Sequence, residues 1–388
     1  MPGINYLKKP GRLRFLISFS KMKKIQLYLL LLLTVLSSCH DEPVYKDSMR
    51  GNFDALADII DRHYCFFADK NIDWAEITSQ YRSQITEETT IFDLFFLCSQ
   101  MLDELKDGHV NLSSKFSVSY YRNWWSDYPQ DFDLRTLEEY YLDFNWMSAS
   151  GIIYKQLPGE IAYIYYPSFA TIISETTLDY ILALMANSRG LIIDIRDNGG
   201  GALTNINTLV GRFIEKKTTG AYLMHKTGPG HDDFSEPYPI EYEPSYGHIG
   251  WRGDIVVLTN RSCFSAANTF VAVMKDLPNV KIVGAKTGGG GGMPFTSELP
   301  IGWGIRFSAC PILDSGKNNI EYGIDPSPGC EVHSPAEELA EGKDAILDFA
   351  IDLLKDNPLP FPPADPDTNP DDGNPEAGQG NPPFVIID

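Results

Sequence analysis

Apolar residues recur at helical spacing in the first third of the chain. Between residues 50 and 108 they lie three or four positions apart, as in Phe53, Leu56 and Ile60. This spacing places them on one face of a helix. Because polar breaks divide the stretch, the pattern predicts an N-terminal helical subdomain of two or three helices over 50–108.

The pattern changes after residue 159, where short apolar runs alternate with amphipathic segments. Runs of four or five Ile, Leu and Val residues are typical of strands that are buried on both faces. The alternation predicts an α/β core domain over 109–356 with a largely parallel sheet. We expect strands at 161–165, 191–195, 254–258, 280–283 and 305–310, and helices at 175–188, 202–215, 266–275 and 335–355.

Three segments fit neither pattern. Residues 110–150 are rich in Tyr and Trp and are interpreted as strands or as a lid over a cleft, although aromatic clusters more often belong to a core. Residues 218–250, with several Pro, Gly and Tyr, are expected to form an irregular excursion or a hairpin. Residues 357–388 consist largely of Pro, Asp, Gly and Asn, a composition that predicts a disordered tail.

The N-terminus has the features of an export signal. Basic residues after Met22 precede the apolar run Leu27–Leu36 and the small residues before Cys39. The run is too short to span a bilayer as a helix, so residues 1–38 are predicted to be a leader and signal peptide. The sequence Leu-Ser-Ser-Cys39 resembles a bacterial lipobox, which implies lipidation of Cys39; a plain secretory signal is the alternative. Residues 39–49 would then tether a membrane-anchored lipoprotein on the periplasmic or cell-surface face.

Composition narrows the classes of function. The formal net charge is −20, and the predicted leader holds seven Lys and Arg but no Asp or Glu, so its removal makes the charge more negative. Such a surface repels phosphate backbones, which argues against nucleic-acid binding. Besides Cys39 there are five cysteines, with no Cys-x-x-Cys pair. No cluster has the spacing of metal ligands, so we expect no metal site and at most one disulfide.

The segment from Leu258 to Phe270 carries the strongest chemical signal. A buried strand runs through a short polar turn into a helix that begins near Ser265. At such a corner a serine hydroxyl stands beside the free N–H groups of the helix start, where an oxyanion can be stabilised. Ser265 is therefore a candidate nucleophile. The competing interpretation is that it only caps the helix, the commonest role of serine there.

A second buried strand ends in the turn Arg196-Asp-Asn-Gly-Gly-Gly201 before a helix. Successive glycines let the backbone approach a ligand closely and adopt positive φ. The turn lacks a Walker lysine and a spaced dinucleotide fingerprint, so phosphate binding is not favoured. We expect the backbone N–H of Gly199 or Gly200, together with that of Ala266, to form an oxyanion hole.

Three motifs follow one another along the core: Asp194-Ile-Arg-Asp-Asn-Gly-Gly-Gly201, Thr259-Asn-Arg-Ser-Cys-Phe-Ser-Ala-Ala267 and Val283-Gly-Ala-Lys-Thr-Gly-Gly289. In this order they resemble the C-terminal processing (tail-specific) peptidase family, and its tricorn-core branch in particular. The resemblance extends from about Asn52 to Leu354. It implies a crotonase-like or ClpP-like spiral α/β core, serine peptidase activity on peptides or unfolded proteins, and no cofactor.

The resemblance also implies a base. In the tail-specific branch this is a lysine about two dozen residues after the serine, but Gly290 occupies that position here and Lys286 matches a different column. The tricorn-like branch uses a histidine after the helical lead-in, where Leu105-Lys-Asp-Gly-His109 falls. A neutral imidazole has a pKa suited to proton transfer near neutral pH. His109 is the candidate base; the alternative is a surface histidine at a helix C-terminus.

The same branch places a glutamate before a Gly-Ile-x-Pro segment, which Glu321 matches. There the glutamate is linked to the histidine through a serine that directly precedes the histidine, but this chain has Gly108 in that place. Water, Asp107 or another hydroxyl is left to orient the base, and Glu321 is alternatively a solvated turn carboxylate. The interval after His109 is too short for the PDZ domain that many relatives insert.

The sequence thus predicts an exported, lipid-anchored serine peptidase that acts through an acyl-enzyme. Ser265 would attack the peptide carbonyl, His109 would transfer the proton, and Glu321 would support the base. One alternative is a catalytically inactive peptide-binding lipoprotein on the same scaffold, favoured by Gly108 and the missing lysine. Another is a Ser–Lys dyad peptidase that uses Lys286. The oligomeric state is left open.

Overall fold

The computed structural model describes residues 44–360 and 384–387. The described residues from Asp47 onwards belong to one compact unit. This unit begins with the helices α2 (Met49–His63), α3 (Trp74–Arg82) and α4 (Ile91–Asp103). Side chains of Ser48, Asp73 and Thr90 cap their first turns, because each accepts a hydrogen bond from an N–H that the helix leaves free. The prediction of a helical N-terminal region is confirmed.

The core contains a six-stranded sheet in the order β10-β9-β5-β4-β3-β2. β10, β9, β5 and β4 are parallel neighbours, whereas β3 and β2 are antiparallel. The predicted α/β class with a largely parallel sheet is therefore confirmed. The strands are β2 (Met147–Ala149), β3 (Ile152–Leu157), β4 (Ile161–Tyr165), β5 (Leu191–Asp194), β9 (Ile255–Thr259) and β10 (Val280–Gly284).

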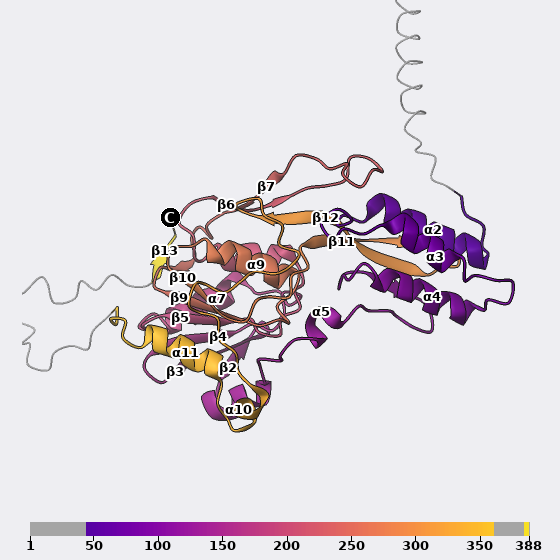
Figure 1. Ribbon diagram of the computed structural model, residues 1–388. Coiled ribbons are helices and arrows are strands. Elements are labelled where there is room, and N and C mark those ends of the chain that lie inside the picture. Colours follow the sequence, from indigo (N-terminus) through magenta and orange to yellow (C-terminus); the bar gives the residue numbers. More distant parts are fainter. Residues whose placement is uncertain (1–43, 361–383, 388) are drawn as a thin grey trace, which may run out of the picture. The chain divides into compact units, whose positions relative to one another are not determined.

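Both faces of this sheet are covered, as Figure 1 shows for α9 and α11 on opposite sides of the strands. Side chains alternate between the faces, so that in β5 Ile193 joins one apolar cluster and Ile192 the other. Because both faces are buried, the strands appear in the sequence as unbroken runs of apolar residues. One face packs against α7 (Glu175–Leu184), α8 (Leu203–Val210) and α9 (Ala266–Lys275), and the other against α11 (Ala345–Leu354) and the π-helix η1 (Leu137–Tyr141).

A second sheet is antiparallel and connects the helical region to the core, because α2 contacts β12 and α4 contacts β1. The loop from α4 into β1 carries residues 104–110 past this junction. Separately, β8 (Ile249–Trp251) pairs with β13 (Phe384–Ile386). The strands of the second sheet are β1 (Asn111–Ser113), β6 (Thr218–Leu223), β7 (Tyr238–Tyr242), β11 (Gly292–Glu298) and β12 (Gly304–Asp314).

Some elements differ from the expected ones. The single helix expected at 335–355 is two helices, α10 (Ala336–Ala340) and α11, because Gly342 adopts a φ of 88° and Asp344 caps a new helix. The helix expected at 175–188 ends at Leu184. The aromatic segment 110–150 holds short helices as well as strands, among them α5 (Asn123–Ser126) and α6 (Leu134–Thr136).

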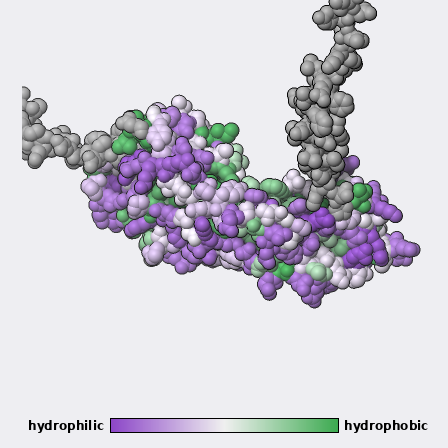
Figure 2. Space-filling model, turned by 90° about the horizontal axis from the view of Figure 1, so that it is seen from above, coloured by the Kyte–Doolittle hydropathy of each residue, from purple (hydrophilic) through white to green (hydrophobic). Residues whose placement is uncertain are grey.

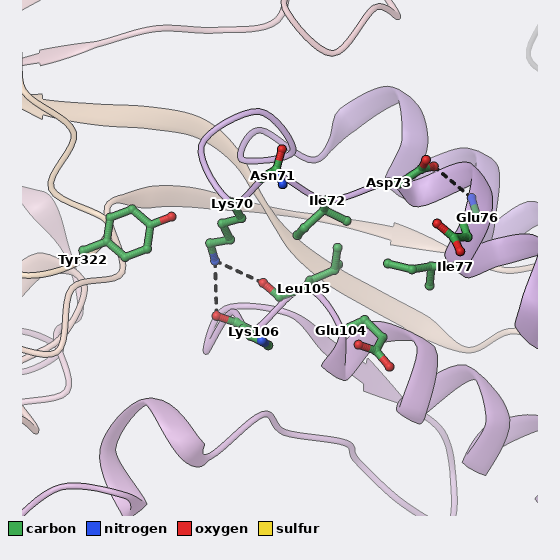
Figure 3. A pocket seen from close by; sticks show the side chains of 10 residues that line it. All are labelled: Lys70, Asn71, Ile72, Asp73, Glu76, Ile77, Glu104, Leu105, Lys106 and Tyr322. Carbon is green, nitrogen blue, oxygen red and sulfur yellow. Dashed lines mark hydrogen bonds between the residues drawn. The ribbon is translucent and has the colours of Figure 1, made fainter.

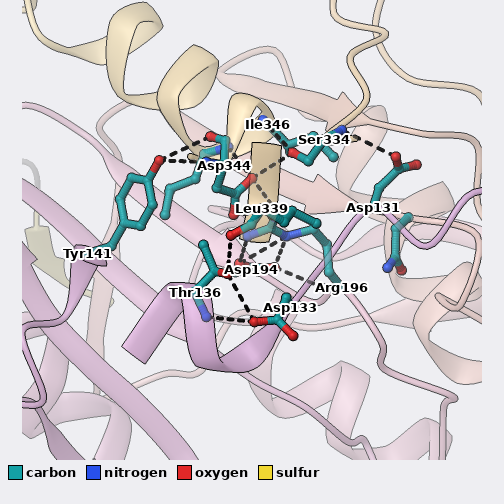
Figure 4. Close-up of polar contacts among 12 residues, drawn as sticks. Asp131, Asp133, Thr136, Tyr141, Asp194, Arg196, Ser334, Leu339, Asp344 and Ile346 are labelled. Carbon is teal, nitrogen blue, oxygen red and sulfur yellow. Dashed lines mark hydrogen bonds and ion pairs between the residues drawn. The ribbon is translucent and has the colours of Figure 1, made fainter. Parts of the chain in front are cut away.

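A buried ionic network joins α11 to the end of β5 (Figure 4). Arg196 pairs with Asp194 at 2.6 Å and with Asp344 at 2.8 Å, and none of the three side chains is more than 2% exposed. The Ser334 hydroxyl donates to Asp344 at 2.8 Å. Because a buried charge needs a fixed partner, the network holds the start of the glycine turn in one position.

The surface agrees with the acidic composition. The face in Figure 2 is mostly hydrophilic, with small and scattered hydrophobic patches. None of the helices in the described ranges combines the length and hydrophobicity needed to cross a membrane. The predicted leader, with Cys39, lies outside the described residues.

Candidate active site

Ser265 stands at the corner between β9 and α9. Its backbone, with φ of 58° and ψ of −120°, lies in a region that residues other than glycine rarely adopt. The Ser265 N–H donates to the Gly289 carbonyl at 2.8 Å, which holds this conformation in place. The side chain of Ser265 makes no capping hydrogen bond. This contradicts the interpretation of Ser265 as a mere helix cap and leaves its hydroxyl available for chemistry.

The glycine turn lies directly against this corner. Gly200 adopts a φ of 95°, and a Cβ atom there would lie 2.8 Å from the Ser265 Cβ and 2.9 Å from the Ala266 nitrogen. No side chain fits at such distances, so glycine is required at this position. The structure thereby brings together Gly200, Ser265 and the first amide of α9.

Asn198 fixes the turn from inside. Its Oδ1 accepts hydrogen bonds from the amides of Gly200 (2.9 Å) and Phe169 (3.3 Å), and its Nδ2 donates to the Tyr166 carbonyl at 2.8 Å. The Gly200 amide is thus already used. A Cβ atom at Gly199, by contrast, would meet nothing within 4 Å. Of the two glycines, Gly200 therefore has its amide engaged, and an oxyanion hole formed by Gly199 with Ala266 stays a prediction.

His109 lies beside the corner but is not hydrogen-bonded to Ser265. Its side chain packs on Phe264, the residue before the serine, with ring centroids 4.7 Å apart. The histidine is only 2% exposed, and neither ring nitrogen has a hydrogen-bond partner among the described residues. Buried polar atoms without partners are rare, and they lower the stability of the fold. The burial of His109 is therefore better explained by a functional role than by a contribution to stability.

Burial also fixes the protonation state of His109. Desolvation lowers its pKa to about 4; Asp107 opposes this shift, whereas Arg306 and Lys70 add to it. The imidazole is therefore neutral near pH 7, which is the form that accepts a proton.

Glu321 is not a solvated turn carboxylate, since it is 8% exposed. Its Oε2 accepts a hydrogen bond from the Gly291 amide at 2.9 Å, and its Oε1 pairs with Lys70 at 2.8 Å. Burial and, second, the charge of Asp107 raise the pKa of Glu321 to about 8, because Lys70 and the Gly291 amide offset their effect only in part. No hydrogen bond links Glu321 to His109, whose two ring nitrogens are unpaired within the described chain.

Two positions explain why a lysine base is disfavoured. A Cβ atom at Gly290, the position of the family lysine, would lie 2.5 Å from the Phe264 ring. Lys286 is 43% exposed and pairs with Asp325 at 3.2 Å. The space that a lysine would need at Gly290 is thus filled by Phe264, and Lys286 is engaged at the surface.

The space beside Gly108 is also filled. A Cβ atom there would lie 2.6 Å from the Trp124 indole nitrogen and 3.0 Å from the Phe264 ring. Trp124 comes from the short helix α5 and stacks on Phe264 at 4.1 Å between centroids. The aromatic segment therefore covers the candidate site and occupies the place of the family serine.

Sequence reasoning missed Asn198, Lys70, Phe264 and Trp124. Asn198 directly precedes the glycines, and Phe264 directly precedes the serine, so their proximity was detectable. Lys70 and Trp124 lie 195 and 141 positions before Ser265, and nothing in their local pattern marks them. Within the described ranges no three His, Cys, Asp or Glu side chains are grouped so that they could hold a metal ion.

Comparison with known proteins places this arrangement in a family. Residues 160–327 match the model of peptidase family S41, and residues 45–103 match that of the tricorn protease C1 domain. The chain is 28% identical over 221 residues to the tricorn protease of Thermoplasma acidophilum, which covers 54% of this chain and 18% of that protein. It is 30% identical over 171 residues to the tail-specific protease of Haemophilus influenzae, covering 42% and 23% respectively.

A solved structure is similar over most of the chain. A crystal structure from Parabacteroides merdae, of a protein described provisionally as a peptidase, is 42% identical, with a TM-score of 0.76 and coverage of 80% of this chain and 97% of that one. The fold and the sequence are therefore similar to those of peptidases of the serine class. This chain belongs to peptidase family S41, which confirms the resemblance and the expected class of enzyme. It spans less than a third of the length of the two curated relatives.

Proposed function

We propose that this chain hydrolyses peptide bonds with Ser265 as nucleophile and His109 as base. The observation that carries the proposal is the contact between the glycine turn and the serine corner. This contact is so close that no side chain would fit at position 200 beside Ser265. A hydroxyl without a capping bond, next to the amides of a helix start, is the arrangement that acyl transfer requires. Peptides or unfolded proteins are the proposed substrates.

The chemistry then proceeds in two halves. The Ser265 Oγ attacks the peptide carbonyl carbon while its proton passes to the His109 imidazole, and the amides of Gly199 and Ala266 hold the resulting oxyanion. The C–N bond breaks, and the imidazolium gives the proton to the leaving amine. Water then attacks the acyl-enzyme while His109 accepts its proton. The ester C–Oγ bond breaks, the imidazolium returns the proton to the Ser265 Oγ, and the carboxylic acid product is released.

The resting arrangement must change for this to happen. The imidazole now faces Phe264 and is unpaired within the described chain. The proposal requires that His109 and the Phe264 ring move so that the imidazole reaches the serine. Catalytic hydrogen bonds are often unmade in free enzymes and form only with substrate.

Labelling with a fluorophosphonate tests the proposal, because the probe reacts only with an activated serine. We expect one adduct on the fragment that contains Ser265, lost in Ser265→Ala and retained in Ser262→Ala, a serine of the same turn. If folded wild-type protein does not react with the probe, the proposed peptidase activity is refuted.

The alternative is a peptide-binding protein without catalysis, which the covered imidazole and the side chains filling the space at Gly108 favour. It predicts binding of unfolded peptide without labelling or turnover. A Ser–Lys enzyme is a weaker candidate, since Lys286 pairs with Asp325. It requires that Lys286→Ala abolish turnover while His109→Gln preserves it.

Export and lipidation at Cys39 are part of the proposal and rest on the sequence of the leader. Expression in a bacterial host with fractionation tests them. The full chain should be found with membranes, and Cys39→Ser should release it or leave the leader uncleaved.

A further inference from the structure

Lys70 is a buried cation shared by two buried carboxylates. Its Nζ lies 2.8 Å from Glu321 and 3.6 Å from Asp107, and the three side chains are 8%, 6% and 0% exposed. It also donates to the carbonyls of Leu105 and Lys106, each at 3.2 Å. Figure 3 shows these two bonds at the wall of a pocket of about 550 Å³ that Tyr322 also lines.

Each carboxylate holds a different part of the candidate site. Glu321 accepts the Gly291 amide at 2.9 Å, and the neighbouring Gly289 carbonyl accepts the Ser265 amide at 2.8 Å. Asp107 accepts the His109 amide at 2.8 Å and the Tyr64 hydroxyl at 3.0 Å. The Lys70 ammonium is thus the one described group that bridges the two carboxylates, one on the histidine side and one on the serine side.

This bridge stands where the chain lacks the serine that links glutamate to histidine in the peptidases it resembles. At Gly108 no side chain fits without displacing Trp124, so a hydroxyl cannot take up the link from there. A lysine can, because its flexible stem reaches the site from another element and its ammonium has three donors. The stem lies near the rings of Tyr64 and Phe66, with Nζ 5.8 and 5.4 Å from their centroids.

We propose that Lys70 is the positioning residue of the candidate site, holding the backbone of His109 beside that of Ser265 by bridging Asp107 and Glu321 in place of the missing serine. This inference rests on the proposed function. Lys70 touches no reacting atom and acts through the two carboxylates. Without its charge, the ionised Asp107 would face Glu321 in a buried space with no cation beside it, and Asp107 would have to turn away or take up a proton.

The groups that face Lys70 come from several elements. They are Tyr64 and Phe66 after α2, Leu105 to Asp107 after α4, and Glu321 and Tyr322 after β12, with His109, Cys65 and Tyr121 close enough to feel its charge. Any change at Lys70 therefore alters the charge around His109 as well as its position.

The test compares three variants by the second-order rate of fluorophosphonate labelling at Ser265, measured from pH 5 to 9. Lys70→Met removes the charge and keeps the length, and Lys70→Arg keeps the charge. Lys217→Met is the matched control, because Lys217 also bridges two carboxylates, Glu241 at 2.7 Å and Glu243 at 3.4 Å, but is 49% exposed.

We expect Lys70→Met to label about 10- to 100-fold more slowly and with a shifted pH profile, as is usual when a supporting partner is lost. Lys70→Arg should recover most of the rate, and Lys217→Met should match wild type. The proposal is overturned if folded Lys70→Met labels within about twofold of wild type with the same pH profile.

If Lys70→Met does not fold, the double variant Lys70→Met with Glu321→Gln removes one of the two acidic groups that would otherwise face each other, and leaves only Asp107. We expect it to fold and still to label slowly; labelling at the wild-type rate would overturn the proposal. Failure of the proposed function is distinguishable from failure of this inference, because in that case wild-type protein itself would not be labelled. In that case the inference is tested by the NMR signal of the His109 imidazole, which is assigned from its absence in His109→Gln. This signal should shift in Lys70→Met and not in Lys217→Met. An unchanged signal in Lys70→Met contradicts the inference.

Discussion

The imidazole of His109 lies against the phenyl ring of Phe264, with 4.7 Å between the ring centroids, while Ser265 is the next residue of the chain. The ring of Phe264 is held in turn by Trp124, 4.1 Å away. The base and the nucleophile of the proposed peptidase are therefore neighbours that an aromatic stack keeps unpaired in the resting chain. This relationship leads to the first prediction.

Removal of the Phe264 ring should speed up labelling of Ser265. Phe264→Ala opens a cavity and should cost about 3–5 kcal/mol of unfolding free energy. The same cavity gives the imidazole space toward the serine. The labelling rate should therefore rise several-fold when it is measured where the variant is fully folded, for example at low temperature. Phe213→Ala, which also removes a buried phenyl ring, should cost similar stability without any gain in rate. A slower rate in folded Phe264→Ala would show that the ring supports the active geometry.

Ser265 and His109 should act as a unit in peptide hydrolysis. Each of Ser265→Ala and His109→Gln should lower kcat by at least about a thousandfold, and the double variant should be no worse than the poorer single variant. The reason is that a nucleophile without its base, or a base without its nucleophile, contributes nothing further. Steady-state rates of the four proteins measure this, and losses that multiply would rule out joint action.

Gly200→Ala should abolish labelling and destabilise the fold. The new Cβ would lie 2.6 Å from the Phe264 carbonyl oxygen and 2.8 Å from the Ser265 Cβ, so the corner must move. Gly159→Ala is the control for backbone strain alone, because Gly159 has a φ of 81° and nothing within 4 Å of its Cβ direction. It should cost roughly 1 kcal/mol and leave labelling unchanged. Equal labelling by the two variants would disprove the close contact.

Glu321 should make stability depend on pH. Burial raises its pKa to about 8, so the folded state favours the protonated form. The stabilisation that results is complete below the ordinary pKa of about 4.3 and is lost as pH rises through about 8. Glu321→Gln removes this dependence, so between pH 5 and 9 its unfolding free energy should fall less than that of wild type, by up to a few kcal/mol.

Urea unfolding at several pH values measures this difference. Glu337→Gln, a substitution at an exposed glutamate, should follow the wild-type curve. Parallel curves for wild type and Glu321→Gln would mean that Glu321 is ionised in the folded protein throughout this range.

Arg196→Met should be among the most destabilising substitutions in the core. It leaves Asp194 and Asp344 buried without their cation, for which a loss of about 3–5 kcal/mol is usual. Arg82→Met breaks the exposed pair with Asp54, where Arg82 is 47% exposed, and should cost about 0–1 kcal/mol. Thermal or chemical unfolding compares them, and similar small losses would show that the network in Figure 4 contributes little.

The sequence by itself determined the elements and the nucleophile corner of this protein. The run 255–259, the turn after it and the helix from Ala266 follow from local apolar periodicity, and the alternation of strands and helices predicted a largely parallel sheet. The glycines at 199–201 marked a close backbone approach because few other residues permit positive φ. These features depend on neighbours within a few positions, which a single sequence displays.

The tertiary structure alone decided how the site is supported and covered. Nothing local connects Lys70 to Glu321, which is 251 positions away, and the two are joined in a buried ion pair. Trp124 lies 16 positions after Gly108, and only the path of the intervening chain brings its ring against that glycine. Burial, which sets the charge of His109 and Glu321, is likewise a property of the assembled core. The sequence determines which chemical groups the side chains carry, whereas the fold determines which groups they contact and how far water reaches them.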